Sequence, residues 1–170
     1  LTHATSGIIV CILFSKFSGV KRRFTLVDKV DEITIVDDYA HHPVEIASVL
    51  SAAREAYNGK VIAIMQPHRY TRLESLFDEF CACFNDADTV IVSPVFEAGE
   101  TPIKGADQEA LINGLQSFGH RDVLKINGPE DIAGVVSEVA VEGDLVIFLG
   151  AGSVSQWAYD LPNALKRIRG

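Results

Sequence analysis

Two short stretches of the chain combine residue types that can bind a small charged molecule. The first is DDYAHHP, residues 37–43, with two carboxylates, a phenol and two adjacent imidazoles. The second is QPHRYTR, residues 66–72, with one imidazole and two guanidinium groups. Carboxylates accept hydrogen bonds, guanidinium groups donate them in pairs to carboxylates or phosphates, and imidazoles can do either. These two stretches are therefore the first candidates for a binding site.

Residues 37–43 leave three interpretations open. A metal site would use the two histidines, but adjacent side chains rarely point the same way, and no third His or Cys stands at ligand spacing. A helix cap would use Asp38, or His42 before Pro43, to satisfy the start of the next helix. A substrate loop would use the acids to accept from hydroxyl groups, and the histidines and the tyrosine to donate.

Residues 66–72 have two interpretations. His68, Arg69 and Arg72 can form a receptor for a carboxylate or phosphate, with Arg72 in the first turn of an expected helix. The alternative is a solvated basic loop.

A third stretch, LGAGS at residues 149–153, resembles half of a dinucleotide fingerprint, but GxG alone is weak evidence, and a substrate-facing turn is favoured. The chain has no GxxxxGK[ST] phosphate loop, so no complete ATP site is predicted.

The elements that must position these residues follow a regular alternation from residue 31 onward. Near-continuous apolar runs predict five strands, at residues 32–38, 59–65, 87–95, 122–126 and 143–152. Helical spacing predicts five helices, at residues 43–57, 71–84, 105–118, 129–140 and 153–168, the last kinked or broken at Pro162. Strands of this kind are buried on both faces. The fold class is α/β, with an open, doubly wound, mostly parallel, Rossmann-like sheet of five or six strands.

In such a sheet, ligands bind beyond the carboxyl ends of the strands. The chemically rich stretches follow the first, second, third and fifth expected strands, so they gather at this edge. The opposite edge holds the ordinary turns NGK, DAD, GHRD and EGD. The sequence therefore predicts one ligand site, at the carboxyl edge.

Composition excludes several classes of partner. A net charge of −8 and a pI near 5.0 argue against nucleic-acid and membrane-surface binding. The longest apolar run, residues 7–14, is too short for a membrane span, which takes roughly 20 residues.

Three cysteines, Cys11, Cys81 and Cys83, show no framework spacing and are interpreted as reduced thiols of a cytoplasmic protein.

Residues 1–24 do not follow the strand–helix rhythm. They contain an apolar segment, then Gly19, then the cations of KRRF. Together with the absence of an initial methionine, this indicates the trailing helix and linker of a preceding domain. If residues 7–14 are exposed, self-association through this apolar segment is expected.

Five stretches, in this order, resemble the C-terminal domain of the Mur ligases of peptidoglycan synthesis: FSGVKRRF, DDYAHHPVEI, QPHRYTR, FEAGETPIKGAD and GDLVIFLGAGSVSQ. The resemblance covers roughly residues 7–170. QPHRYTR together with GVKRRF is similar to the branch that joins L-alanine to UDP-N-acetylmuramate. The alternatives are the branch that recycles murein tripeptides, which shares DDYAHHP, and a non-catalytic module that binds an anion or an amino acid.

The resemblance implies a three-domain enzyme in which residues 1–24 end the central ATPase domain and residues 25–170 form the C-terminal domain. ATP and Mg²⁺ would be bound mainly by the central domain, and ATP would phosphorylate the carboxylate of UDP-N-acetylmuramate. The amine of L-alanine would then attack the acyl phosphate. The C-terminal domain would be a lid that brings the amino acid, and the fragment alone would be inactive.

The same resemblance implies roles for individual residues. The L-alanine site would consist of Tyr39, His41, His68, Arg69 and Arg72, with the two arginines holding the carboxylate. Asp38 would accept from the ribose of ATP, and Arg23 at the hinge would reach its phosphates. His42 would cap or pack. No residue of the fragment is assigned as a catalytic residue or a metal ligand.

Overall fold

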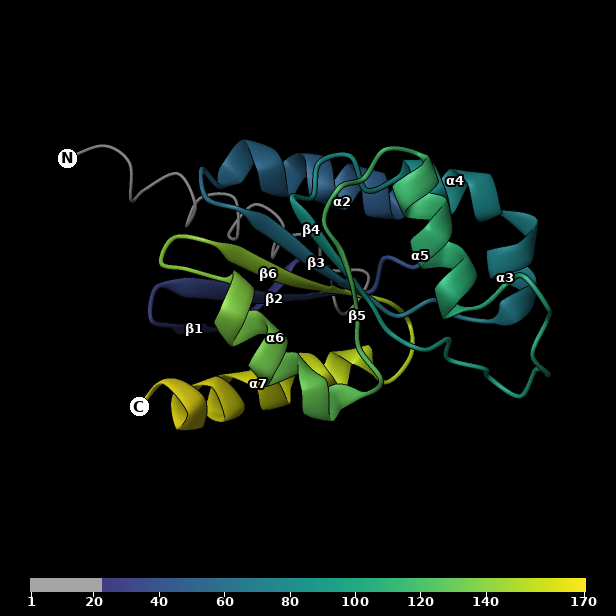
Figure 1. Ribbon diagram of the computed structural model, residues 1–170. Coiled ribbons are helices and arrows are strands. Elements are labelled where there is room, and N and C mark those ends of the chain that lie inside the picture. Colours follow the sequence, from purple (N-terminus) through teal and green to yellow (C-terminus); the bar gives the residue numbers. More distant parts are fainter. Residues whose placement is uncertain (1–22) are drawn as a thin grey trace.

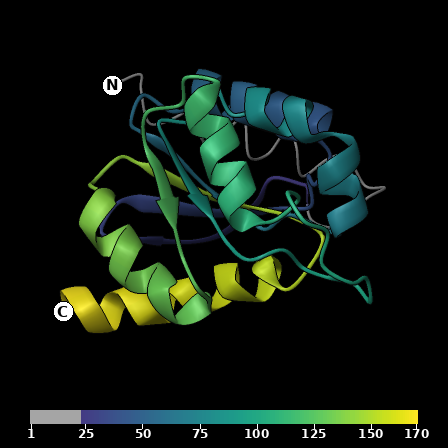
Figure 2. The ribbon, with the colours of Figure 1, turned by 45° about the vertical axis from the view of Figure 1, so that its right-hand side comes forward.

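The computed structural model describes residues 23–170 (Figure 1). Three expectations concern residues outside this range: the structure of residues 1–22, self-association through residues 7–14, and the state of Cys11. The described part is a three-layer α/β structure with a central sheet and helices on both faces (Figures 1 and 2). The fold class expected from the sequence is confirmed.

The sheet has six strands in the order β1-β2-β6-β3-β4-β5. Five of them are parallel, and β1 runs antiparallel to β2 at one edge. Their bounds are β1 Thr25–Val30, β2 Ile33–Asp38, β3 Val61–Met65, β4 Thr89–Val92, β5 Val123–Lys125 and β6 Leu145–Leu149. The last strand in the sequence, β6, lies between β2 and β3, so the strand order reverses there.

The helices form two layers. On one face lie α2 Pro43–Ala56, α3 Tyr70–Ser75, α4 Phe77–Ala82 and α5 Gln108–Ser117; on the other lie α6 Pro129–Val139 and α7 Val154–Arg169 (Figure 2). Alternation along the strands divides the core between these layers. In β3, Ala63 and Met65 pack with the α2–α5 layer, while Ile62 and Ile64 pack with α6 and α7. Because both faces are covered, the central strands are buried throughout.

The register of the sheet aligns the carboxyl ends of four strands. Leu149 at the end of β6 pairs with Asp38 of β2 on one side and Met65 of β3 on the other, and Met65 also pairs with Val92 of β4. The segments that follow these residues therefore leave the sheet along one row. This edge, at the reversal of strand order, is where parallel sheets bind ligands.

Three details differ from the elements expected from the sequence. Strand β1 is the sixth strand that the expected fold class allowed, but its position was not predicted, because its pattern is mostly half-exposed rather than apolar. The single helix expected over residues 71–84 is two helices, since the backbone of Leu76 leaves the helical region (φ −123°, ψ 29°). The stretch has no Gly or Pro to mark this point. Pro162 does not break α7, which runs through it.

Cys81 and Cys83 are buried free thiols, as expected. Burial, with the negative charge of Asp78 as a second cause, raises the pKa of Cys81 to about 11. Within residues 23–170, no helix combines the length and the apolar character that a membrane span requires.

Candidate functional site

The turn after β2 is held by backbone N–H groups that donate to the Asp38 side chain, one from the loop and one from residue 24. Asp38, the last residue of β2, is buried, and its two carboxylate oxygens accept from the backbone N–H groups of Phe24 (2.6 Å) and Ala40 (2.7 Å). Burial raises the pKa of Asp38, and the two backbone hydrogen bonds and the charge of Arg23 oppose that shift. Asp38 therefore holds the turn after β2 and fastens residue 24 to it.

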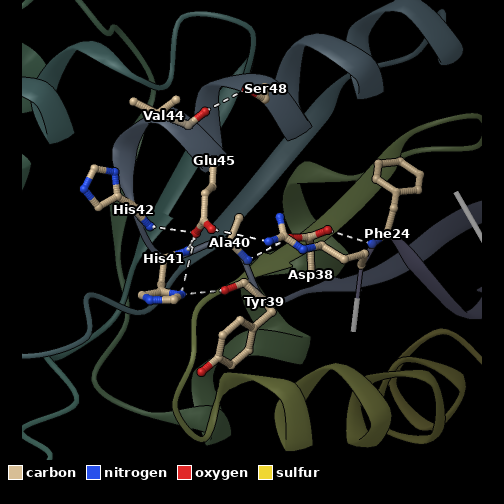
Figure 3. A network of polar contacts seen from close by, with 10 residues as sticks. Phe24, Asp38, Tyr39, Ala40, His41, His42, Val44, Glu45 and Ser48 are labelled. Atoms are coloured by element: carbon tan, nitrogen blue, oxygen red, sulfur yellow. Dashed lines mark hydrogen bonds and ion pairs between the residues drawn. The ribbon is translucent and has the colours of Figure 1, made fainter. Parts of the chain in front are cut away.

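Helix α2 begins with His42 at the N-cap position and Pro43 in its first turn. The cap itself is completed by Glu45, three residues later. Its Oε2 atom accepts from the backbone N–H groups of His41 (3.2 Å) and His42 (3.3 Å), as Figure 3 shows. Sequence reasoning missed Glu45. The spacing of N-cap to third helical residue with a glutamate there is the capping-box signal that could have found it.

Aromatic and imidazole rings from three strand ends form a continuous row. Ring centroids of Tyr39 and His41, after β2, lie 4.9 Å apart in an edge contact. His41 lies 5.9 Å from His68, which follows β3. His68 stacks on Phe96, which follows β4, at 5.3 Å. The structure therefore brings Tyr39, His41 and His68 together, and it adds Phe96, which was not predicted as a site residue.

Hydrogen bonds assign different proton positions to the two histidines of this row. Nδ1 of His41 lies 2.9 Å from the carbonyl of Tyr39, and since a carbonyl only accepts, this nitrogen carries a proton. Nδ1 of His68 lies 3.1 Å from Nη1 of Arg72, and since a guanidinium only donates, this nitrogen carries none. Nε2 is thus left as an acceptor in neutral His41 and as a donor in His68.

Of the three site arginines Arg23, Arg69 and Arg72, Arg72 makes the most side-chain hydrogen bonds within residues 23–170. Besides its contact with the His68 imidazole, its Nη1 donates to the His68 carbonyl at 3.0 Å. Burial, followed by the positive charges of Arg72, His41 and Arg69, lowers the pKa of His68. His68 is therefore neutral at neutral pH, and it can accept from Arg72 there.

Arg69 stands at the N-cap of α3 in a left-handed backbone conformation, with φ 75°. A non-glycine residue keeps this conformation only where its surroundings hold it. Its N–H donates to the carbonyl of Phe96 (2.9 Å), and the Phe96 N–H donates to the carbonyl of Pro67 (2.8 Å). Farther along, Glu100 accepts from both the backbone N–H and the hydroxyl of Thr71. The segment after β4 thus holds the start of α3, and the Arg69 side chain is exposed.

Arg23 lies on the other side of the α2 N-terminus. Its Nη2 atom is 3.3 Å from Oε1 of Glu45. A hollow of about 310 Å³ opens here, lined by Arg23, Phe24, Asp38, Val44, Glu45, Ser48, Val49 and Ala52. The two residues expected to contact ATP, Arg23 and Asp38, therefore border one cavity, separated from the ring row by Glu45.

The LGAGS turn after β6 packs closely against β3 and its following loop. Gly150 has φ 149°, and a Cβ there would lie 2.9 Å from the carbonyl oxygen of Gln66. The Gln66 amide donates to the Ser153 hydroxyl (3.0 Å) and accepts from the Val154 N–H (3.1 Å). Glycine is required here by close approach of the chain, and Gln66 fixes the start of α7.

A second, larger hollow of about 510 Å³ adjoins the row on the α6–α7 side; its lining consists of Gln66, residues 94–99, residues 127–129 and Trp157. It contains none of the site residues named from the sequence. Among residues 23–170, no cluster of three or more His, Cys, Asp or Glu side chains is placed to hold a metal ion.

Known proteins resemble this chain closely. It is 59% identical over 152 residues to a UDP-N-acetylmuramate–L-alanine ligase from Bradyrhizobium sp. (strain ORS 278), covering 89% of this chain and 32% of the relative. It is 64% identical over 149 residues to the ligase of the same name from Chelativorans sp. (strain BNC1), covering 88% and 32%. The chain thus spans about a third of the length of these relatives.

The fold has solved counterparts. The crystal structure of a UDP-N-acetylmuramate–alanine ligase from Thermotoga maritima matches with a TM-score of 0.68 at 26% identity, over 91% of this chain and 31% of that one. The family model described as "Mur ligase, glutamate ligase domain" matches residues 22–152. This chain belongs to the Mur ligase family, through its glutamate ligase domain.

Proposed function

We propose that this chain is the amino-acid-binding lid domain of an ATP-dependent ligase that joins L-alanine to UDP-N-acetylmuramate. The observation that carries the proposal is that the segments after β2 and β3 meet. The ring centroids of His41 and His68 lie 5.9 Å apart, and Arg72 is hydrogen-bonded to His68. The relatives bearing the name of the alanine-adding enzyme support this reaction over tripeptide recycling.

The row offers the complementary groups that a free amino acid needs. Arg69 and Arg72 receive the carboxylate, because a guanidinium group can donate two parallel hydrogen bonds to a carboxylate. The Nε2–H of His68 adds a donor beside them. When His41 carries its proton on Nδ1 alone, its Nε2 can accept from the amino group, and Tyr39 closes that side of the row. The amine of the bound L-alanine is then the nucleophile that forms the amide bond.

ATP and Mg²⁺ are assigned mainly to a central domain outside this chain, with residues 1–24 as its end and linker and residues 25–170 as the lid. ATP would supply activation of the UDP-N-acetylmuramate carboxylate. In this chain Arg23 fits a phosphate contact, since it borders the 310 Å³ hollow. Asp38 reaches a ribose only if Phe24 moves, because both carboxylate oxygens already accept backbone hydrogen bonds. ATP and the nucleotide-sugar substrate place the proposed reaction in the cytoplasm.

The test is an ADP-release assay of the full-length ligase that carries this domain, with UDP-N-acetylmuramate and Mg·ATP. L-Alanine should support ADP release at a higher kcat/KM than the murein tripeptide. A higher kcat/KM for the tripeptide would assign the domain to the recycling branch, and no ADP release with either acceptor would contradict a ligase.

A further inference from the structure

The Glu45 carboxylate stands between the two halves of the proposed site. Its Oε2 atom accepts from the backbone N–H groups of His41 and His42, at 3.2 and 3.3 Å. Its Oε1 atom pairs with Arg23 at 3.3 Å. In Figure 3 the carboxylate of Glu45 lies next to the backbone of His41 and His42, and the contact between Asp38 and Phe24 lies on its other side. The Glu45 side chain therefore contacts both the loop that carries His41 and the arginine proposed to face the nucleotide, Arg23.

The contacts keep Glu45 ionised. Burial would raise its pKa, but hydrogen bonds from His41 and His42 and the charges of His41 and Arg23 lower it overall. Its side chain is 31% exposed and that of Arg23 is 38% exposed. The Glu45–Arg23 pair is thus a partly solvated ion pair, weak enough to open when a stronger anion arrives.

The two contacts have opposite consequences for ligand binding. Oε2 fixes the backbone of His41, and so favours the amino-acid row. Oε1 holds the guanidinium that a nucleotide phosphate would use, and places a negative charge beside that phosphate. The apparent affinity for the nucleotide is the intrinsic affinity multiplied by the fraction of molecules in which Arg23 is free to bind it. Pairing of Arg23 with Glu45 lowers that fraction.

Building on the proposed function, we propose that Glu45 is a positioning residue with opposed effects on the two substrates. It holds the His41 loop in place for the amino acid, and it retains Arg23 until a nucleotide phosphate displaces it. When ATP binds, Arg23 leaves Glu45. ATP binding thus changes the contacts of the same carboxylate that holds the His41 loop.

The experiment compares two substitutions of Glu45 in the full-length ligase. Glu45→Gln keeps one oxygen for the His41 and His42 N–H groups, but its NH₂ group cannot pair with Arg23. The Kd of ADP, measured by calorimetry, should fall by roughly 1.5- to 5-fold, the strength of an exposed ion pair. The KM for L-alanine should stay within about twofold. Glu45→Ala loses both contacts, so its KM for L-alanine should rise several-fold while ADP still binds more tightly.

Two controls separate this inference from general effects and from the proposed function. Glu55→Gln removes the same charge from the exposed part of α2, and it should change neither constant. Arg23→Ala should weaken ADP binding, and Glu45→Gln added to Arg23→Ala should give no gain in affinity.

Each outcome has a definite meaning. If Arg23→Ala weakens ADP binding but Glu45→Gln does not strengthen it, the role of Glu45 is wrong and that of Arg23 stands. If Arg23→Ala leaves ADP binding unchanged, the assignment of Arg23 to the nucleotide is wrong, and the inference about Glu45 is overturned with it. Parallel losses for both substrates in Glu45→Gln would indicate a purely structural residue.

Discussion

Arg72 donates to two acceptors of one residue, the imidazole Nδ1 of His68 at 3.1 Å and its backbone carbonyl at 3.0 Å. The first of these bonds exists only while Nδ1 is unprotonated, because a guanidinium has no acceptor. The residues are four positions apart, across the junction of β3 and α3. Their pairing therefore ties the orientation of the guanidinium to the protonation state of a neighbouring histidine.

The first prediction concerns the titration of His68. Burial and nearby positive charges lower its pKa, so its imidazole NMR signals should titrate with a midpoint below the usual value of 6.5. As the pH falls through 6.5, the unfolded chain gains a proton that the folded chain resists, so the stability due to this group is lost there. A His68→Gln variant identifies the signal. A midpoint at or above 6.5 would show that Arg72 does not face a neutral imidazole.

The second prediction concerns the turn after β6. Gly150→Ala should lower the free energy of unfolding by about 1–3 kcal/mol, because alanine is strained at φ 149° and its Cβ would meet the Gln66 carbonyl. Gly134→Ala is the matched control. It lies inside α6 with open space around its Cβ position, and alanine there should stabilise by about 0.5–1 kcal/mol. Urea unfolding measures both, and equal effects would contradict the close-approach account.

The third prediction concerns the 170-residue chain by itself. It should show no Mg²⁺-dependent ATP hydrolysis, since its sequence has no phosphate loop of the GxxxxGK[ST] type. Phosphate release from Mg·ATP, measured with the purified chain and with the full-length ligase in parallel, tests this. Hydrolysis by the chain above the buffer background would mean that a nucleotide site is complete within it.

Much of the fold could be predicted because its strands are buried on both faces. Continuous apolar runs such as VIAIM at β3 and LVIFL at β6 have few other structural explanations. Strand β1 could not be predicted, since its residues are mostly half-exposed and only pairing with β2 makes it a strand. The break at Leu76 is likewise set by packing and not by a helix-breaking residue.

The site was predictable at the level of loops and less so at the level of contacts. The carboxyl-edge rule placed His41 near His68, because β2 and β3 both pair with β6. Phe96 and Glu100 were missed because their contacts depend on the path of a loop between β4 and α5. The occupation of the Asp38 carboxylate by backbone N–H groups depends on residue 24, fourteen positions away, and no local pattern signals it.

The most direct test of the proposed function is the separate loss of amino-acid affinity in two arginine variants. If both arginines bind the carboxylate as proposed, Arg69→Ala and Arg72→Ala in the full-length ligase would each remove a charged hydrogen bond worth about 1.5–3 kcal/mol. Arg121→Ala, an exposed arginine at the opposite edge of the sheet, is the control. Steady-state kinetics should show a KM for L-alanine raised roughly 10- to 150-fold in both site variants, with the KM for ATP unchanged. A KM for L-alanine within about twofold of the wild type in both, or a rise confined to ATP, would contradict the carboxylate site.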